Sequence, residues 1–281
     1  LIHSPIGLVR EAQTLLAPQL RDLYNAHPSA HGFIKERSVL SNAKLHTGQK
    51  QVFNIDLQDF FPSINFGRVR GLFMAPPFQL GPAAATVFAQ LCTHRNGLPQ
   101  GAPTSPHLSN FIAADLDRRL TRLARENGCR YSRYADDITF SCNHPNMPPA
   151  LAAFAQDGEQ LTVSVGEALE RAISASGFSI NHGKVRLQKR HTRQTVTGLN
   201  VNEFANVSRL RVRRIRAMLH AWEKFGIEKA AVHHFLNHRG LKRLPKNFAR
   251  EYRNVVYGQL SFLKMVRGPE DQVFLKFAAR V

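Results

Sequence analysis

The segment YSRYADDITFS, residues 131–141, places aromatic and β-branched residues on both sides of two adjacent acids. This pattern predicts a β-hairpin whose tight turn contains Asp136 and Asp137. The flanking apolar residues make the hairpin half-buried, which is a costly position for an unpaired carboxylate. A bound divalent cation would remove that cost, although an isolated Asp-Asp pair is also common in turns that have only a structural role.

A third carboxylate lies about eighty residues earlier in the chain. Residues 51–55 alternate as a strand that leads into Asp56, and two phenylalanines follow at positions 60 and 61. Alone, Asp56 could be the N-cap of a helix. Together with Asp136 and Asp137 it forms a candidate site of three carboxylates, the hard oxygen ligands that suit Mg²⁺. Two such ions ~3.5–4 Å apart would support an in-line displacement by a 3′-hydroxyl on a nucleoside triphosphate.

A loop rich in small residues and proline, GLPQGAPTSP at residues 97–106, stands directly before a predicted helix. Its glycines let the backbone approach a ligand closely, and Gln100 offers an amide to a sugar or a base. A rigid loop followed by a capped helix is the alternative interpretation.

The rest of the chain is mixed α/β to about residue 205 and then mostly helical and basic. We expect one helix to begin at Ser4 and Pro5, with Ser4 as its cap, and another to run from Ser105 to near Gly128. A further helix is predicted from Glu159 to Gly177, after a proline-containing interval with no readable role. Beyond Ser208, breaks between helices are expected at the positions Gly226, Gly240, Pro245 and Gly268.

Composition limits the classes of function. The 281 residues carry a formal net charge of +18, which favours a polyanionic partner such as nucleic acid. Three cysteines without CxxC spacing suit a reducing cytoplasm, and no stretch approaches the ~20 apolar residues of a membrane helix. The Arg-rich helices lack a clear opposing apolar anchor face, so no membrane partner is expected. His234 and His238 stand four residues apart, but without an HExxH motif or a cysteine we expect no metal there.

The motifs, taken in order, resemble the palm motifs of reverse transcriptases: residues 53–61, then QGAPTSP at 100–106, then YADD at 134–137. Lys184, in the sequence NHGK, resembles the lysine of the next palm motif, and residues 197–200 resemble the hairpin that grips the primer end. NAKLH at 42–46 and VTG at 196–198 are similar to the NAxxH and VTG elements of retron reverse transcriptases. The resemblance implies an α/β (α+β) right-hand polymerase fold, with fingers and a ferredoxin-like antiparallel palm sheet in residues 1–205 and a basic helical thumb in 206–281.

The resemblance also implies roles for individual residues. Asp56, Asp136 and Asp137 would bind two Mg²⁺ ions, with the backbone carbonyl of Leu57 as a further ligand. Phe61 would lie under the incoming sugar and reject a 2′-hydroxyl, Gln100 would contact the nucleotide, and Lys184 would act near the pyrophosphate. Phe61 could instead be a core residue, and Lys184 a solvated surface lysine.

In retrons the enzyme pairs with its own structured noncoding RNA and primes synthesis from a guanosine 2′-hydroxyl, leaving a branched RNA–DNA molecule (msDNA). The resemblance therefore implies deoxynucleotide substrates, the RNA and its DNA product as partners, a possible effector or toxin protein, and a role in antiphage defence. The residues expected to contact RNA are Asn42, His46, Val196, Thr197, Gly198, Arg209, Arg211, Arg213, Arg214 and Arg216. Another bacterial reverse transcriptase (intron, diversity-generating or abortive-infection) and an inactive RNA-binding scaffold remain as alternatives.

Overall fold

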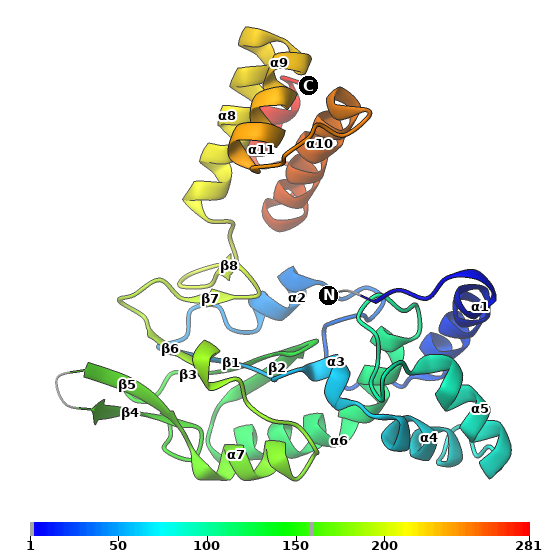
Figure 1. Cartoon of the computed structure of the whole chain (residues 1–281). Coiled ribbons are helices and arrows are strands. Elements are labelled where there is room, and N and C mark those ends of the chain that lie inside the picture. Colours follow the sequence, from blue (N-terminus) through cyan, green and yellow to red (C-terminus); the bar gives the residue numbers. More distant parts are fainter. Residues whose placement is uncertain (1–2, 158–159) are drawn as a thin grey trace. The chain divides into compact units, whose positions relative to one another are not determined.

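The computed structural model describes residues 3–157 and 160–281 (Figure 1). The chain divides into two compact units, which are described separately below. The first contains Leu1–Thr197 and Val201–Glu203, and the second contains Gly198–Asn200 and Phe204–Val281. Two short strands, β7 (Thr195–Val196) and β8 (Leu199–Asn200), lie on either side of this division.

A four-stranded antiparallel sheet forms the centre of the first unit, in the order β2-β3-β1-β6. Its strands are β1 (Gln51–Asp56), β2 (Arg130–Tyr134), β3 (Asp137–Cys142) and β6 (Arg186–Lys189). Every residue of β1 is buried, and this strand lies between β3 and β6 in the sheet. The mixed α/β class with an antiparallel sheet, predicted from the sequence, is confirmed.

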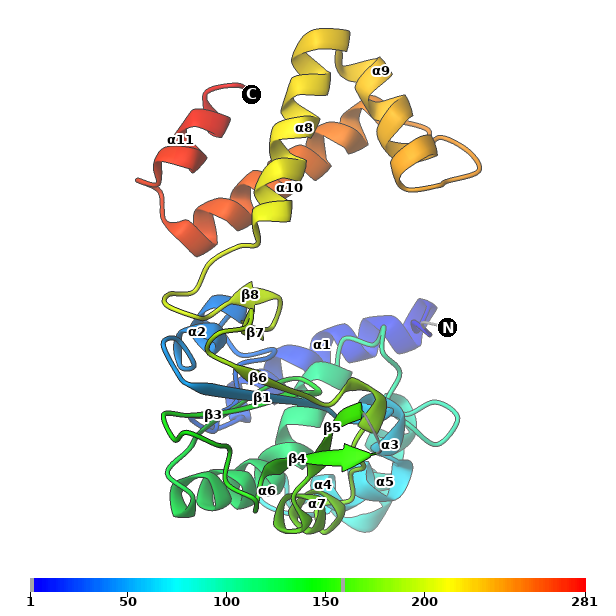
Figure 2. The same cartoon turned by 90° about the vertical axis from the view of Figure 1, so that its left-hand side faces the viewer.

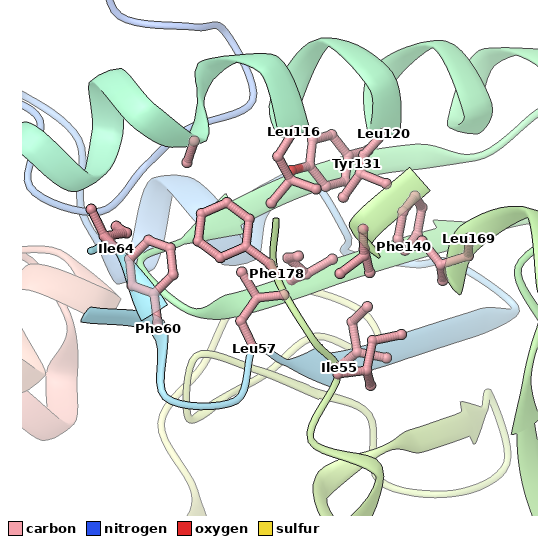
Figure 3. Packing of buried hydrophobic residues seen from close by; sticks show 14 of the residues in the cluster. Ile55, Leu57, Phe60, Ile64, Leu116, Leu120, Tyr131, Phe140, Leu169 and Phe178 are labelled. Carbon is pink, nitrogen blue, oxygen red and sulfur yellow. The ribbon is translucent and has the colours of Figure 1, made fainter. Parts of the chain in front are cut away.

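The hydrophobic core lies on one face of this sheet, under α6 (Ser105–Glu126) and α7 (Glu167–Ser174). Side chains alternate between the faces of a strand, so Phe53 and Ile55 of β1 enter the core while Asn54 and Asp56 face the other side. Figure 3 shows Ile55 and Leu57 on the same side of the sheet as Leu116 and Leu120 of α6, with Phe60 and Phe178 close by. The opposite face is therefore free to carry polar groups.

Most of the remaining helices of the first unit lie together at one side of this sheet (Figure 1). They are α1 (Gly7–Leu23), α2 (Val39–Lys44), α3 (Phe60–Ser63), α4 (Phe66–Met74), α5 (Pro82–Cys92) and the 3₁₀ turn η1 (His182–Lys184). The predicted Ser4 cap is wrong, because Ile6 is the N-cap of α1. The Ser4 hydroxyl instead donates a hydrogen bond to the Gly101 carbonyl at 3.0 Å.

The interval after the Asp-Asp hairpin also differs from the prediction. Residues 152–157 and 160–165 form the antiparallel strands β4 (Ala152–Asp157) and β5 (Gln160–Val165), so the helix expected there begins only at Glu167. The predicted start, Glu159, lies outside the described residues. Leu161, Val163 and Val165 recur at every second position, and this strand periodicity outweighed the helical reading.

The second unit is built of helices (Figure 2). They are α8 (Arg209–Phe225), α9 (Ile227–Val232), the π-helical turn η2 (His233–His238), α10 (Phe248–Arg267) and α11 (Gln272–Ala278). Ser208 caps α8 by accepting a hydrogen bond from the Arg211 amide. The four breaks predicted for this part of the chain are confirmed. Across the described residues of both units, no helix is sufficiently long and apolar to cross a bilayer.

Candidate active site

The Asp-Asp hairpin turns one residue earlier than the sequence predicts. Tyr134 pairs with Asp137, so the two turn residues are Ala135 and Asp136, and Asp137 is already the first residue of β3. Ala135 has a φ of 57°, in the left-handed region that two-residue hairpin turns favour. The two adjacent acids therefore differ in setting: Asp136 lies in the turn, and Asp137 lies in the sheet.

Asp56 and Asp137 are direct partners in the β1–β3 ladder. The Leu57 amide donates to the Asp136 carbonyl at 3.1 Å, which makes 57 and 136 the hydrogen-bonded pair and 56 and 137 the neighbouring non-bonded pair. In such pairs the Cα atoms are about 4.5 Å apart and the side chains lie on the same face. The fold thus brings the three predicted carboxylates together, beside the backbone of Leu57.

Burial and mutual repulsion perturb these carboxylates. The pKa of Asp137 is raised to about 6, first by burial and then by the negative charges of Asp136 and Asp56. Burial also raises the pKa of Asp136, and Asp56 adds to that effect. The Asp56 side chain is itself buried. Burial and repulsion between the carboxylates therefore both disfavour the charged forms of Asp136 and Asp137.

A bound divalent cation would offset both effects, because the carboxylates would then hold the cation in place of protons. Within residues 3–157 and 160–281, no three His, Cys, Asp or Glu side chains are arranged around a common point as metal ligands. Mg²⁺, however, usually takes only one or two protein carboxylates and completes its shell with water and substrate phosphates. The chemistry of the donors, a buried group of like-charged carboxylates, is therefore the observation that supports a metal site.

Lys184 is joined to the carboxylate cluster by a hydrogen bond. Its Nζ donates to Asp56 Oδ2 at 2.9 Å, and this bond is the main reason that the pKa of Lys184 is raised. The Asn181 amide donates to the Asp56 carbonyl at 2.8 Å and so attaches the lysine-bearing segment to the end of β1. The Lys184 side chain is still 60% exposed, which leaves its ammonium accessible to a substrate.

Phe61 lies in α3, five residues after Asp56, and its ring is half-buried against Phe60 and Phe33, with centroids 5.4 and 6.1 Å away. The Leu98 amide donates to the Phe61 carbonyl at 3.1 Å, and a Cβ on Gly97 would come within 2.7 Å of the Pro62 carbonyl oxygen. The close approach requires glycine at 97. It holds the loop bearing the exposed Gln100 against α3.

Sequence reasoning missed one residue of this region, Arg133. Its guanidinium is completely buried and donates to both oxygens of Asp117 on α6, at 2.8 and 2.7 Å. It also donates to the Ala135 carbonyl of the turn at 3.1 Å and to the Asn110 side-chain oxygen at 3.2 Å. The sequence contained a signal for this network. Arg133 is two residues after Tyr131 in a strand and therefore shares its core-facing side, and Asn110 and Asp117 are seven residues apart and therefore share one helix face.

A second support for the turn comes from Gly32. A Cβ at this position would lie 2.5 Å from the Ala135 backbone nitrogen, so any side chain larger than hydrogen would displace the turn. The Asn110 amide donates to the Gly32 carbonyl at 2.9 Å. The Ala135–Asp136 turn is thus enclosed by Gly32 on one side and by the Arg133 guanidinium on the other.

The residues predicted to contact RNA in the first unit are in different settings. The His46 imidazole is fully buried, and its two ring nitrogens hydrogen-bond the hydroxyls of Ser141 and Ser132 at 2.7 Å each. Asn42 and Val196 are also fully buried. Direct RNA contact by these three side chains is therefore withdrawn. The Thr197 hydroxyl donates to the Val39 carbonyl, and its side chain is half-buried.

The predicted RNA-binding residues of the second unit lie nearer to solvent. Gly198 is exposed, and so are four of the five arginines at the start of α8: Arg209, Arg213, Arg214 and Arg216. Arg211 is half-buried, donates to Gln259 Oε1 at 3.0 Å and stacks on the Phe262 ring.

Comparison with known proteins gives the family. The family model described as reverse transcriptase (RNA-dependent DNA polymerase) matches residues 2–201. Two Myxococcus xanthus proteins, the retron Mx65 and Mx162 reverse transcriptases, are 37% and 36% identical over 78% and 79% of this chain. The Escherichia coli retron Ec86 reverse transcriptase is 33% identical over 78% of this chain and 64% of its own length.

The chain belongs to the reverse transcriptase family, and the matched residues include the antiparallel sheet with the carboxylate pair at one end. The Myxococcus and Escherichia relatives that it matches are all retron reverse transcriptases. The chain spans about half the length of the two Myxococcus relatives, 52% and 50%. A solved structure of apo telomerase from Candida tropicalis aligns with a TM-score of 0.46 and 11% identity, over 96% of this chain and 53% of that one.

Proposed function

We propose that the protein is the RNA-directed DNA polymerase of a bacterial retron, which copies part of a structured noncoding RNA into a branched, RNA-linked single-stranded DNA. The observation that carries this proposal is the ladder pairing of Asp56 with Asp137, beside Asp136 in the turn, in a chain of the reverse transcriptase family. On this proposal, residues 1–205 are the fingers and palm, and residues 206–281 are a basic thumb that binds RNA.

The three carboxylates would hold the divalent cations of the reaction, two Mg²⁺ ions on our proposal, with the Leu57 carbonyl as an additional oxygen donor. When bound, these ions would lower the pKa of a primer hydroxyl and neutralise charge on the leaving pyrophosphate. Lys184 already donates to Asp56. We assign it to the triphosphate side of the site, where an accessible ammonium can donate a proton or a hydrogen bond to the leaving group.

Two further residues would define the substrate as a deoxynucleoside triphosphate. Phe61, held by α3 and by the bond from Leu98, would place its ring edge where a ribose 2′-hydroxyl would otherwise fit. Gln100, on the exposed loop against α3, would donate its amide to the incoming nucleotide.

The partners on this proposal are the cognate RNA, its DNA product and an effector or toxin protein in an antiphage unit. RNA contacts are proposed for the surface around Thr197 and Gly198 and for the arginines of α8. The three cysteines are free, which suits the reducing cytoplasm that we propose as the location.

The first experiment replaces Asp136 with Asn in the full chain. We expect DNA synthesis on a primed RNA template to fall about 100-fold or more, because the carboxylate that supports several kcal/mol of metal-based stabilisation is lost. RNA that copurifies with the protein should remain, since Asp136 belongs to the first unit and the basic helices belong to the second. The control is Asp115→Asn, which makes the same change on the outer surface of α6. Full activity of the Asp136 variant would refute the catalytic assignment.

The second experiment tests the retron type of product. Nucleic acid that copurifies with the protein from its native host is deproteinised and analysed before and after RNase and debranching treatment. A short DNA whose mobility changes after both treatments is the expected result. A DNA product without a 2′,5′ branch would instead favour another class of bacterial reverse transcriptase.

A further inference from the structure

The second unit contains a cavity of about 440 Å³ bounded by α8, the π-helical turn η2 and α10. Figure 2 shows α8 and α10 crossing, with α9 and the loop that follows it beside them. None of the residues that line the cavity is acidic, and three of them are arginines: Arg211, Arg214 and Arg239. A cavity of this composition is suited to an anion.

The arginines of α8 divide into two groups by their position on the helix. Arg211 and Arg214 are three residues apart, share a face, and line the cavity together with Met218 one turn later. Arg213 and Arg216 are also basic, and both are exposed, but neither lines the cavity. Positive charge alone therefore does not define the cavity, because only some of the arginines of α8 line it.

The π-helical turn contributes the opposite wall. The Arg239 amide donates to the His234 carbonyl at 2.9 Å, which closes a wide turn that brings His234, His238 and Arg239 to one side. π-Helical turns are rare in proteins, and those that occur often lie at functional sites. His234 Nε2 is buried and has no hydrogen-bond partner. Burial and the positive charges of His238, Arg239 and His233 lower the pKa of His234, so this side of the cavity lacks a compensating anion.

The surrounding charge is equally one-sided. Residues 204–281 contain seventeen Lys and Arg but five Asp and Glu. Two of these acids already pair elsewhere: Glu223 with Arg280, and Asp271 with Arg267. The guanidinium groups at the cavity make no ion pair among the described residues, although Arg211 donates to Gln259. Guanidinium forks match phosphate oxygens bidentately.

We propose that this cavity binds a phosphate group of a nucleic acid backbone, with the adjoining sugar against its apolar wall. Arg214 and Arg239 are the phosphate donors, Arg211 is held ready by Gln259 and Phe262, and Met218 and Val255 contact the sugar. The volume exceeds that of a single ion, since a water molecule occupies about 30 Å³ in the liquid. This inference deepens the proposed function, because it assigns RNA binding to one defined site in the second unit.

The test uses the full chain and two probes. The first probe is inorganic phosphate, compared with chloride at equal ionic strength in a thermal unfolding assay. We expect phosphate to raise the Tm of the wild-type protein and of the controls Arg243→Gln and Arg250→Gln, which change exposed arginines outside the cavity and outside α8. The cavity variants Arg214→Gln and Arg239→Gln should lose that shift. Equal shifts in all four variants would overturn the site.

The second probe is an RNA hairpin with a stem of about 16 base pairs, whose affinity is measured against salt concentration. Each cavity variant should bind about tenfold more weakly and lower the salt slope by about one, as expected for one lost phosphate contact. The controls should change the affinity less than threefold. Loss of the phosphate shift with unchanged RNA binding would assign the cavity to a free phosphate or mononucleotide and overturn the backbone assignment.

Neither assay requires DNA synthesis. Failure of the polymerase proposal would therefore appear as inactivity of the wild-type chain, while failure of the cavity proposal would appear as equal behaviour of cavity and control variants. Circular dichroism of each variant confirms that the exposed substitutions leave the fold intact.

Discussion

Phe61 illustrates how a single side chain can have two roles that the sequence does not separate. Its ring packs on Phe60 and is counted among the groups that lie against the core, yet it remains only half-buried. The exposed part of the ring is available to a ligand in the same segment that carries Asp56. Both interpretations made from the sequence, core residue and sugar contact, are therefore compatible with this position.

Replacing Phe61 with Val separates these roles. We expect the ratio of kcat/KM for ribonucleotides to that for deoxynucleotides to rise at least about tenfold, because removing the ring opens space for a 2′-hydroxyl. Because both values of kcat/KM come from the same preparation, any loss of folded protein cancels in their ratio. Phe61→Tyr keeps the ring and should retain discrimination. Unchanged discrimination in the valine variant, measured by single-nucleotide primer extension, would remove Phe61 from the nucleotide site.

At the level of secondary-structure elements, the β2–β3 hairpin depends on α6 for the position of its turn. The Arg133 guanidinium joins Asp117 of the helix to the Ala135 carbonyl of the turn, with all three groups shielded from water. We infer that Arg133 is a positioning residue for Asp136. A buried ion pair is weak support for stability in itself, but breaking it by removing one partner leaves an uncompensated charge.

This inference predicts a difference between folding and activity. Arg133→Met alone should destabilise the protein by about 3–5 kcal/mol, since Asp117 remains charged and buried. The double variant Arg133→Met with Asp117→Leu should recover most of that stability in urea unfolding. Its kcat should nevertheless stay at least about tenfold low, because the turn carbonyl still lacks its donor. Recovery of kcat together with stability would show that the network has a structural role only.

For the molecule as a whole, two buried histidines link stability to pH. Burial, with Arg130 and His31 nearby, lowers the pKa of His46 to about 3, and burial with Arg37 lowers that of His31 to about 4. Both are below the usual value of about 6.5, so the unfolded chain binds more protons than the folded chain at acidic pH. The contribution of these two histidines to the free energy of unfolding should be fully present above about pH 6.5 and decrease as the pH falls toward 4.

The variant His46→Gln tests this linkage. An amide can hydrogen-bond both Ser132 and Ser141 but cannot take up a proton, so the loss of stability between pH 7 and pH 5 should decrease by up to about 1.4 kcal/mol per pH unit. The control, His191→Gln, changes an exposed histidine and should leave the dependence unaltered. Urea unfolding at several pH values provides the measurement. An identical dependence in wild type and His46→Gln would exclude His46 as its source.

The local pattern of residues was sufficient for much of this protein. Strand alternation before Asp56 and around the Asp-Asp pair, the helix starting at Ser105, and the glycine and proline breaks after Ser208 all depend on neighbours in the chain, and each matches the structure. The order of the acidic motifs was also enough to indicate the family. Where two periodicities competed, as in residues 160–165, local reasoning failed.

Long-range pairing determined the remainder. The register that sets Asp56 opposite Asp137 depends on hydrogen bonds between segments eighty residues apart, and a slip of one residue would turn either side chain to the other face. The pairing of β2 with β3 sets Ser132 and Ser141 on one face, where both bond the buried His46, so a residue expected to contact RNA instead links two strands. Burial and contact between distant segments are properties of the packed chain, and for that reason the hydrogen-bond partners of Arg133 and the cavity of the second unit were identified only from the tertiary structure.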